Sequence, residues 1–356
     1  MMNILVAIDR FEDILTSGEA SSYIEEGVKT VYPNANVISV PLFDGQKHLI
    51  EGILSWQQGI KYNWQIQDAN LRQREVTAAL IHDCLYIDCS RVFSQTADLL
   101  DTSSYGLGQM ILNGLDLGYR SFTIALGESQ VYDYGIGMLE KLGAVFFDID
   151  DHKMTGPLSS AHIKHVRRID LSGLDDRLSE STFKVISDLD YYLFGNKSQV
   201  ADSIIEDAVK MTIDNNIWYL NEQYKKAGLS VNPKNGGHAG GLRSIFESLF
   251  DARILSSKDM IFEETSLKDL LDEADAVIYG GGTVRPSESS LVAQAITQKA
   301  GPQLYIYLSA GQQFAPPSEA VHFLNIYPDM STDTDKLKLG IQLQNSIKTI
   351  LAIAKK

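Results

Sequence analysis

Two aspartates separated by a single residue are the side chains of this chain best placed for chemistry. Asp188 and Asp190 follow residues 183–186, an apolar segment with the composition of a buried strand. In open α/β sheets, ligands bind beyond the carboxyl ends of the strands. Carboxylates at that position can hold Mg²⁺, or one of them can take a proton from a substrate hydroxyl. The alternative is a turn in which both side chains only bond the nearby backbone.

Three segments rich in glycine and hydroxyl residues are candidates for binding an anion. They are residues 102–109 with Gly106 and Gly108, residues 236–242 with Gly237, Gly240 and Gly241, and the run Gly280, Gly281 and Gly282. The first two run into helix-like stretches, and the third follows a strand-like one. Exposed backbone N–H groups at such places bind phosphate or carboxylate. Each segment could equally be a turn that needs positive φ, and residues 102–109 could be a helix cap.

Residues 125–139 have the pattern of a glycine-rich active-site loop that passes into a helix. Its frame consists of Gly127, Asp133, Gly135 and Gly137. Within this frame, Glu128 and Tyr132 add charge and bulk where small and amide side chains are expected. The loop therefore bears directly on whether the protein is an enzyme.

Composition excludes several classes of protein. The formal net charge of −15 argues against nucleic acid or an anionic membrane as a partner, because phosphates would be repelled. The chain has no apolar run of about 18 residues, and it lacks the phosphate-loop, nucleophile-elbow and HExxH motifs. Cys84 and Cys89 are its only cysteines, which predicts free thiols in a reducing cytoplasm.

Both ends of the chain alternate strand and helix patterns. Near the N-terminus, residues 4–8 predict a buried strand, Thr16 and Glu19 have capping-box spacing, and residues 37–42 predict the next strand. Near the C-terminus, strands are predicted at 276–279 and 304–308, and helices at 291–299 and around residues 343–351. This alternation predicts one doubly wound α/β domain built from residues 1–59 and 261–356.

The middle of the chain has a different pattern. Strand-like segments at 62–66, 84–89, 121–126 and 145–148 are not all separated by full helices, and residues 204–226 predict a long helix. We therefore predict that residues 60–260 form an inserted, mixed α/β domain.

The order of these motifs resembles the bacterial type I glycerate kinase family over nearly the whole chain. The family's Gly-Gly-Ser-Ala-Thr-Asn-Asp-Gly-Gly-Ala-Gly-Met-Leu lies over residues 127–139, and its Asp-Val-Asp-Asn-Pro-Leu corresponds to residues 188–193. Its Gly-Ala-Gly-Gly-Leu-Gly resembles residues 237–242. Three further family motifs correspond to residues 9–12, 41–48 and 103–109.

The resemblance implies a flavodoxin-like domain with an inserted α/β domain, and a site in the cleft between them. It implies Mg²⁺-supported transfer of the γ-phosphoryl group of ATP to a glycerate hydroxyl. Asp188 and Asp190 would act as general base and in Mg²⁺ handling, with Asp190 as the metal ligand. Asp9, Asp44, Ser129 and Asp133 would position the substrate, and the glycines of the three segments would border phosphates. The implied partners are a small organic acid and a nucleotide, and a homo-oligomer is possible.

Several positions of the implied site differ from the family motifs. Glu12 stands in place of a lysine, and Lys47 in place of an acidic residue. The family's Gly-Glu-Gly-Arg-Ile-Asp reads Gly-Gly-Gly-Thr-Val-Arg over residues 280–285. Loss of a lysine and an arginine removes charge-assisted hydrogen bonds to an anion, of about 1.5–3 kcal/mol each.

These differences support alternative hypotheses. The protein could be a non-catalytic relative that binds a metabolite or a protein partner through the altered cleft. Tyr132, Tyr134, Tyr191 and Tyr192 would then form a contact surface, or they would only fill space left by a lost ligand. A third hypothesis is a phosphotransferase that acts on a different acceptor.

Overall fold

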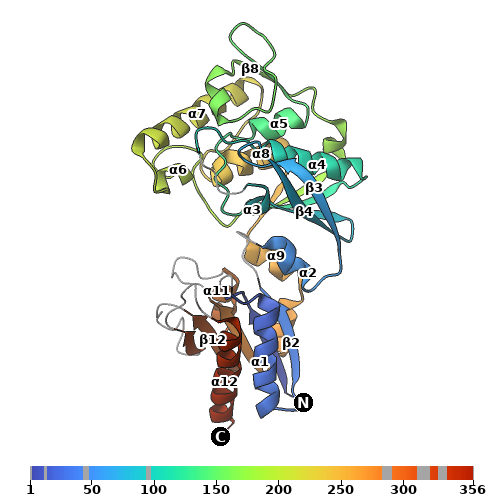
Figure 1. Cartoon of the computed structure of the whole chain (residues 1–356), viewed down its shortest axis with the longest axis vertical. Helices are drawn as coiled ribbons and strands as arrows, with labels where there is room; N and C mark the ends of the chain where they lie inside the picture. Colours follow the sequence, from blue (N-terminus) through green and yellow to red (C-terminus); the bar gives the residue numbers. More distant parts are fainter. Residues whose placement is uncertain are drawn as a thin grey trace. The chain divides into compact units, whose positions relative to one another are not determined.

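A computed structural model describes residues 2–11, 14–42, 48–93, 98–282, 291–310, 321–327 and 335–355. The chain divides into two compact units (Figure 1). Unit 1 comprises Met1–Asp44, Glu51–Trp56 and Ser257–Lys356, and unit 2 comprises Gly45–Ile50 and Gln57–Ser256. Unit 1 is thus assembled from both ends of the chain. Unit 2 is formed almost entirely by one continuous stretch.

Unit 1 contains a parallel five-stranded sheet with the strand order β13-β12-β11-β1-β2. Its strands are β1 (Asn3–Ile8), β2 (Asn36–Pro41), β11 (Ala276–Gly281), β12 (Leu304–Ala310) and β13 (Val321–Tyr327). Its helices are α1 (Ser17–Val31), α9 (Ser257–Glu264), α10 (Leu267–Glu273), α11 (Leu291–Gln298) and α12 (Lys336–Ala354). This strand order is that of a flavodoxin-like doubly wound sheet.

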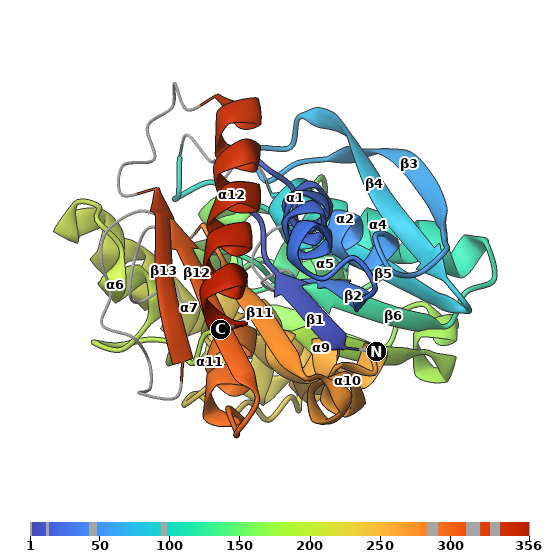
Figure 2. The ribbon, with the colours of Figure 1, turned by 90° about the horizontal axis from the view of Figure 1, so that it is seen from below.

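Helices cover both faces of the unit 1 sheet. On one face, apolar residues of α1 and α12 pack on alternate residues of β1, including Ile4, Val6 and Ile8. On the other, α10 and α11 contact β1 and β11 (Figure 2). The capping box predicted at the start of α1 is present, because Thr16 accepts from the Glu19 N–H and Glu19 accepts from the Thr16 N–H. Strands buried on both faces explain the continuous apolar runs of the sequence.

Unit 2 contains a mixed six-stranded sheet with the order β10-β9-β6-β5-β4-β3 and a separate hairpin of β7 and β8. Its strands are β3 (Ile60–Gln67), β4 (Gln73–Ile81), β5 (Cys84–Asp88), β6 (Ser121–Ala125), β7 (Val145–Phe147), β8 (Arg168–Asp170), β9 (Thr182–Ile186) and β10 (Arg253–Leu255). Its helices are α3 (Cys89–Val92), α4 (Tyr105–Asp116), α5 (Ile136–Lys141), η1 (Ser160–His165), η2 (Asp176–Glu180), α6 (Gln199–Asp202), α7 (Asp207–Lys226), η3 (His238–Gly241) and α8 (Leu242–Leu249). Helix α2 (Leu49–Leu54) contains a boundary between the two units, because its first two residues belong to unit 2 and the rest to unit 1.

The sheet of unit 2 is parallel from β10 to β5 and antiparallel from β5 to β3. The antiparallel hairpin of β3 and β4 explains why no helix pattern separates those strands in the sequence. Cys84 and Cys89 are not joined by a disulfide. Among the described residues, no helix is long and apolar enough to cross a membrane.

Candidate active site

The parallel strands of unit 2 end together at one edge of the sheet. In register, Asp88 of β5 lies beside Ala125 of β6, Ala125 beside Ile186 of β9, and Ile186 beside Leu255 of β10. The loops that follow these strands therefore meet at this carboxyl edge, where α/β folds bind ligands. The predicted aspartate turn and the predicted glycine-rich loop follow two adjacent strands, β9 and β6.

Asp190 forms an ion pair with an arginine that the sequence reasoning did not select. Nη1 of Arg243 donates to Oδ1 of Asp190 over 2.8 Å, to the Leu189 carbonyl over 3.1 Å, and to Oγ of Ser187 over 3.3 Å. The Arg243 side chain is 11% exposed, whereas that of Asp190 is 74% exposed. The buried guanidinium therefore holds the turn that carries the two aspartates on its interior side, and the Asp190 carboxylate faces solvent.

His238 extends this network to the loop after β6. Its Nδ1 lies 2.7 Å from Oγ of Ser187, and its Nε2 lies 2.7 Å from the Gly127 carbonyl. A carbonyl accepts only, so Nε2 carries the proton and Nδ1 accepts from the Ser187 hydroxyl. Burial lowers the pKa of His238 to about 4, and the nearby Arg243 charge acts in the same direction. The imidazole is therefore a neutral link between β9 and β6.

Asp133 is the anchor of the predicted glycine-rich loop. Its carboxylate is fully buried and accepts hydrogen bonds from the Ser104 N–H and hydroxyl and from the Gly135 and Gly137 N–H groups. Burial raises the pKa of this carboxyl, and the four hydrogen bonds act against that rise. The structure thus gives Asp133 an internal role in shaping the loop, and contact with a substrate stays a prediction.

Ser129, the other candidate in this loop, is also directed inward. It is 1% exposed, its hydroxyl donates to the Leu126 carbonyl, and its own carbonyl accepts from Nε2 of Gln199 over 3.1 Å. Glu128 and Gln130, on either side of it, are exposed. The residues that this loop presents to solvent are therefore the larger polar ones.

The tyrosines of the loop fill the interior of unit 2. Tyr132 and Tyr134 are 1% and 0% exposed, and the Tyr134 ring packs edge-on against Tyr224 with centroids 5.0 Å apart. Burial raises the pKa of Tyr132 to about 12. A contact surface that includes Tyr132 and Tyr134 is therefore excluded, whereas Tyr191 and Tyr192 are only partly buried.

The glycines of segments 102–109 and 236–242 allow close packing of the backbone. A Cβ on Gly106 would lie 1.9 Å from the Gln67 carbonyl oxygen, and one on Gly237 would lie 2.0 Å from that of Tyr192. Gly240, at φ +59, faces the Val131 carbonyl in the same way. The remaining predicted glycines, Gly108 and Gly241, lie against Met138 and Lys141, and against the Tyr134 ring.

The backbone N–H groups of three of these glycines also form hydrogen bonds within unit 2. The Gly108 N–H donates to the Ser104 carbonyl over 3.4 Å. The Gly237 N–H donates to the Tyr191 carbonyl over 2.9 Å, and the Gly240 N–H donates to Oε1 of Gln199 over 3.3 Å. Phosphate binding by these glycines stays a prediction.

Unit 1 brings together Asp9 and the run Gly280, Gly281 and Gly282, at the point where its strand order reverses. Asp9 follows β1, and its N–H donates to the Gly280 carbonyl over 2.8 Å. The Gly282 N–H donates in turn to the Arg10 carbonyl over 3.0 Å. Gly281 lies against Asp9, since a Cβ there would be 2.9 Å from the aspartate Cβ. This switch point is where flavodoxin-like folds bind ligands. Asp44, Glu12, Lys47 and Thr283 lie outside the described residues.

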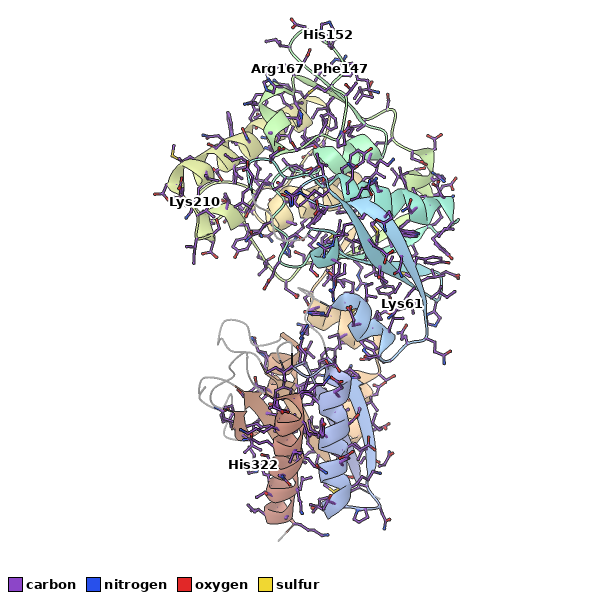
Figure 3. All side chains as sticks on the ribbon, viewed as in Figure 1. Lys61, Phe147, His152, Arg167, Lys210 and His322 are labelled. Atoms are coloured by element: carbon purple, nitrogen blue, oxygen red, sulfur yellow. The ribbon has the colours of Figure 1, made fainter. Side chains whose placement is uncertain are left out.

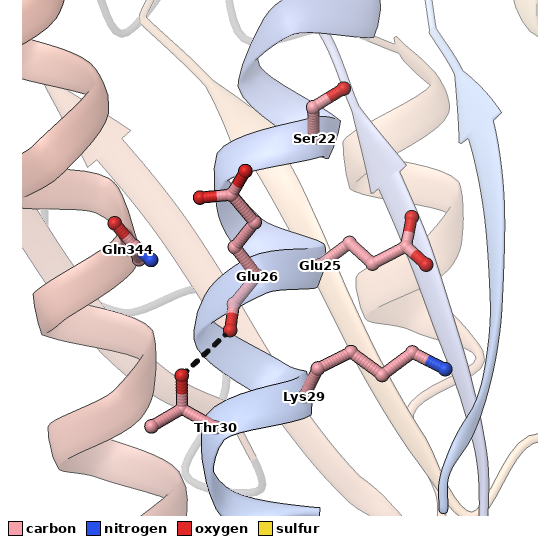
Figure 4. A pocket seen from close by; sticks show the side chains of 6 residues that line it. All are labelled: Ser22, Glu25, Glu26, Lys29, Thr30 and Gln344. Atoms are coloured by element: carbon pink, nitrogen blue, oxygen red, sulfur yellow. Dashed lines mark hydrogen bonds between the residues drawn. The ribbon is translucent and has the colours of Figure 1, made fainter. Parts of the chain in front are cut away.

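Two other polar groupings on the described surface have contacts that are explained without a ligand. Asp148, Asp150 and His152 place possible metal-ligand atoms within 4.8 Å of one another, on the turn where Figure 3 labels His152. Oδ1 of Asp148 accepts there from the N–H groups of Asp150 and His152, as in an ordinary turn. A depression between α1 and α12 is lined by Ser22, Glu25, Glu26, Lys29, Thr30 and Gln344, with the Thr30 hydroxyl bonded to the Glu26 carbonyl (Figure 4).

Sequence comparison identifies the family. The sequence profile of the glycerate kinase family matches residues 4–299. The chain belongs to the glycerate kinase family. The resemblance of its motifs is thereby confirmed, and the Asp188–Asp190 turn and the loops around it fall within the matched region.

Named relatives in this family cover most of the chain. The glycerate 2-kinase of Escherichia coli (strain K12) is 27% identical over 307 residues, which span 80% of this chain and 77% of the relative. The glycerate kinase of Halalkalibacterium halodurans is 27% identical over 333 residues, which span 88% and 87%. A crystal structure from Salmonella typhimurium LT2, of a protein assigned as glycerate kinase 2, matches with a TM-score of 0.87 at 22% identity and covers 99% of this chain and 98% of that one. This structural match confirms the predicted fold class.

Proposed function

We propose that this protein transfers the γ-phosphoryl group of ATP to a hydroxyl group of glycerate. Membership of the glycerate kinase family over residues 4–299 supports the reaction class, as do the relatives that carry the name glycerate kinase. The observation that carries the proposal is the Asp188–Asp190 turn, which lies at the carboxyl edge of the unit 2 sheet and is held there by the buried Arg243. Its ligands would be a small organic acid and a nucleotide.

The Asp190 carboxylate fits the requirements of Mg²⁺. Its hydrogen bond to Arg243 uses Oδ1, and the side chain is 74% exposed. A site that offers one or two carboxylate oxygens and leaves room for water suits Mg²⁺, which usually keeps several water ligands and also binds substrate phosphates. We propose Asp190 as the protein ligand of this ion. When bound, Mg²⁺ would neutralise charge on the phosphates of the nucleotide.

Asp188 is the proposed general base. As the glycerate hydroxyl oxygen bonds to the γ-phosphorus, the Asp188 carboxylate would take the hydroxyl proton. The bond from the γ-phosphorus to the bridging oxygen breaks, and ADP leaves with that oxygen. The chemistry places few covalent demands on the protein, so that positioning of the two reactants supplies most of the acceleration.

Measurement of ADP release with Mg-ATP and D-glycerate tests the proposal. We expect turnover by the wild-type protein, and a loss of about 100-fold or more in kcat for Asp188→Asn, which removes the base. Asp190→Asn should require a higher Mg²⁺ concentration for half-maximal rate. The matched control is Asp150→Asn, since Asp150 is an exposed aspartate of unit 2 on the turn after β7.

Two results would contradict the proposal. Full activity in Asp188→Asn would show that the base lies elsewhere. Absence of turnover in the wild-type protein, together with no thermal stabilisation by ATP, would overturn the kinase function and leave the non-catalytic hypothesis. A cytoplasmic location and a homo-oligomeric state remain predictions.

A further inference from the structure

Arg243 is a buried cation whose charge is only partly balanced by the protein. Its side chain is 11% exposed, and the carboxylate that pairs with it, Asp190, is 74% exposed and therefore screened by water. Its other two hydrogen-bond partners among the described residues, the Ser187 hydroxyl and the Leu189 carbonyl, are neutral, and so is His238 behind Ser187. Burial of a charge is costly unless it is paired and hydrogen-bonded.

Within the described part of the chain, the Arg243 guanidinium makes all its hydrogen bonds through one nitrogen. Its three hydrogen bonds leave from Nη1, whereas Nε is buried and has no hydrogen-bond partner among the described residues. The Nε and Nη2 protons point in the same direction and form a fork that matches the two oxygens of a carboxylate or phosphate. The fork on Arg243 thus lacks the acceptor that such a group normally has.

The position of Arg243 also favours an anion. It is the second residue of α8 (Leu242–Leu249), and no side chain caps the N-terminus of this helix. The partial positive charge of a helix N-terminus adds to that of the guanidinium. Both lie beside the Asp188–Asp190 turn, at the edge of the sheet where the reacting groups are proposed to meet.

We propose that the Nε–Nη2 edge of Arg243 binds an oxyanion of a substrate, either the carboxylate of the organic acid or a phosphate of the nucleotide. The inference rests on the proposed function for the identity of these ligands. It assigns an anion-binding cation to a chain that carries Glu12 and Thr283 where its family motifs carry lysine and arginine. Arg243 itself directly follows Leu242, the last residue of the segment that resembles the family motif Gly-Ala-Gly-Gly-Leu-Gly.

The neighbouring carboxylates set the conditions of the test. Asp188 and Asp190 would repel an anion at Arg243, and Mg²⁺ on Asp190 would remove part of this repulsion. Binding is therefore measured by calorimetry at fixed ionic strength, with and without Mg²⁺. The probes are D-glycerate and ATP, each paired with a neutral analogue that lacks the anionic group, glycerol and adenosine.

Arg243→Gln should weaken the binding of one anionic probe about 10- to 100-fold and leave its neutral analogue unchanged. Arg243→Lys keeps the charge but lacks the fork, so it should lose affinity to a smaller extent. Arg177→Gln is the matched control, because Arg177 pairs with Asp116 and Asp175 elsewhere in unit 2. Its affinities should equal those of the wild-type protein.

The pattern of losses distinguishes the two sources of the oxyanion. Weaker binding of D-glycerate alone identifies the carboxylate, and weaker binding of ATP alone identifies a phosphate. Affinities within about twofold of wild type for both probes, in a folded Arg243→Gln protein, would overturn the inference. Since binding is measured without turnover, a loss of affinity in a protein that proves inactive would overturn only the kinase proposal.

A readout on the wild-type protein keeps the test decisive if Arg243→Gln does not fold. The buried Nε–H of Arg243 should give a ¹⁵N resonance that is absent from the spectrum of Arg243→Lys. Saturation with the bound probe should shift this resonance, because the proton gains an oxyanion acceptor. An unchanged resonance at saturation with both D-glycerate and Mg-ATP would contradict the proposal.

Discussion

At the scale of residues, the carboxyl edge of unit 2 depends on one chain of buried polar groups. Arg243 donates to Ser187, Ser187 donates to His238, and His238 donates to the Gly127 carbonyl. Each link has the donor and acceptor it needs only while the imidazole is neutral. A protonated His238 would present a second N–H to Ser187 and place a second positive charge near Arg243. The geometry of the aspartate turn is therefore linked to the protonation state of a residue that does not need to touch a ligand.

His238 should make the stability of the protein depend on pH in the acid range. Its pKa is about 4 in the folded state and 6.5 in the unfolded state, so the unfolded chain binds more protons between these values. The free energy of unfolding should therefore fall as the pH falls, by about 2 kcal/mol from pH 7 to pH 5 for this residue. Urea denaturation at both pH values measures the loss, which should be smaller by that amount in His238→Gln.

The control for this prediction is His152→Gln, which removes a histidine whose side chain is 78% exposed. Its pH dependence should match that of the wild-type protein. An equal pH dependence in His238→Gln and wild type would show that folding does not lower the pKa of His238.

At the scale of elements, the glycine-rich segment before α8 packs against the loop after β6. Gly240 has φ +59, and a Cβ there would lie 1.9 Å from the Val131 carbonyl oxygen and 2.8 Å from Cα of Tyr132. Both obstacles are backbone atoms, which cannot rotate away as a flexible side chain can. The glycines of this segment thus bring two loops of the carboxyl edge into contact and so place His238 beside Gly127.

Gly240→Ala should destabilise the protein by considerably more than positive φ alone explains. Gly118→Ala is the matched control, because Gly118 has φ +93 and nothing lies within 4 Å of a Cβ there. The control should cost about 1 kcal/mol for the left-handed conformation, whereas Gly240→Ala should cost several kcal/mol because the loops must separate. Urea denaturation of the two variants at pH 7 compares them. Equal losses in the free energy of unfolding would show that the two loops can move apart without destabilising the protein.

The sequence predicted the elements that are governed by local signals. The Thr16–Glu19 capping box and the buried strands β1, β6 and β9 follow from residues close together in the chain. Strands β4, β8, β10 and β13 were missed. For β4 the reason is its hairpin pairing with β3, which leaves no helix pattern between the two strands to mark where the second one begins. The roles of Arg243 and His238 were missed as well. Arg243 bonds Asp190, 53 residues away, and His238 bonds Gly127, 111 residues away. A local sequence pattern does not predict contacts between residues so far apart in the chain.

At the scale of the whole molecule, the two units have separate hydrophobic cores. The cluster of buried residues in unit 2 runs from Ile66 to Ala252 and contains no residue of unit 1. The cluster of unit 1 joins residues 4–35 to residues 276–351. Since a domain is defined by its own core, the chain is an insertion of one potential folding unit into another. The sequence predicted this insertion at residues 60–260. The prediction was based on the change from regular alternation of strands and helices to a mixed pattern.

A fragment of residues 57–256 should therefore fold without the rest of the chain. Its sheet, its core and the whole network from Arg243 to Gly127 lie within this range, and a chain of about 200 residues can bury a sufficient core. We expect a cooperative urea transition and dispersed amide resonances in its NMR spectrum.

A fragment of residues 45–256 should be more stable by about 1 kcal/mol, because it regains the hydrogen bond from the Leu49 N–H to the buried Asp88 carboxylate. If both fragments lack a cooperative transition while the full-length protein shows one, the core of unit 2 requires unit 1 for its stability. Cooperative folding of both fragments would instead make unit 2 a scaffold on which binding to the carboxyl edge can be measured alone.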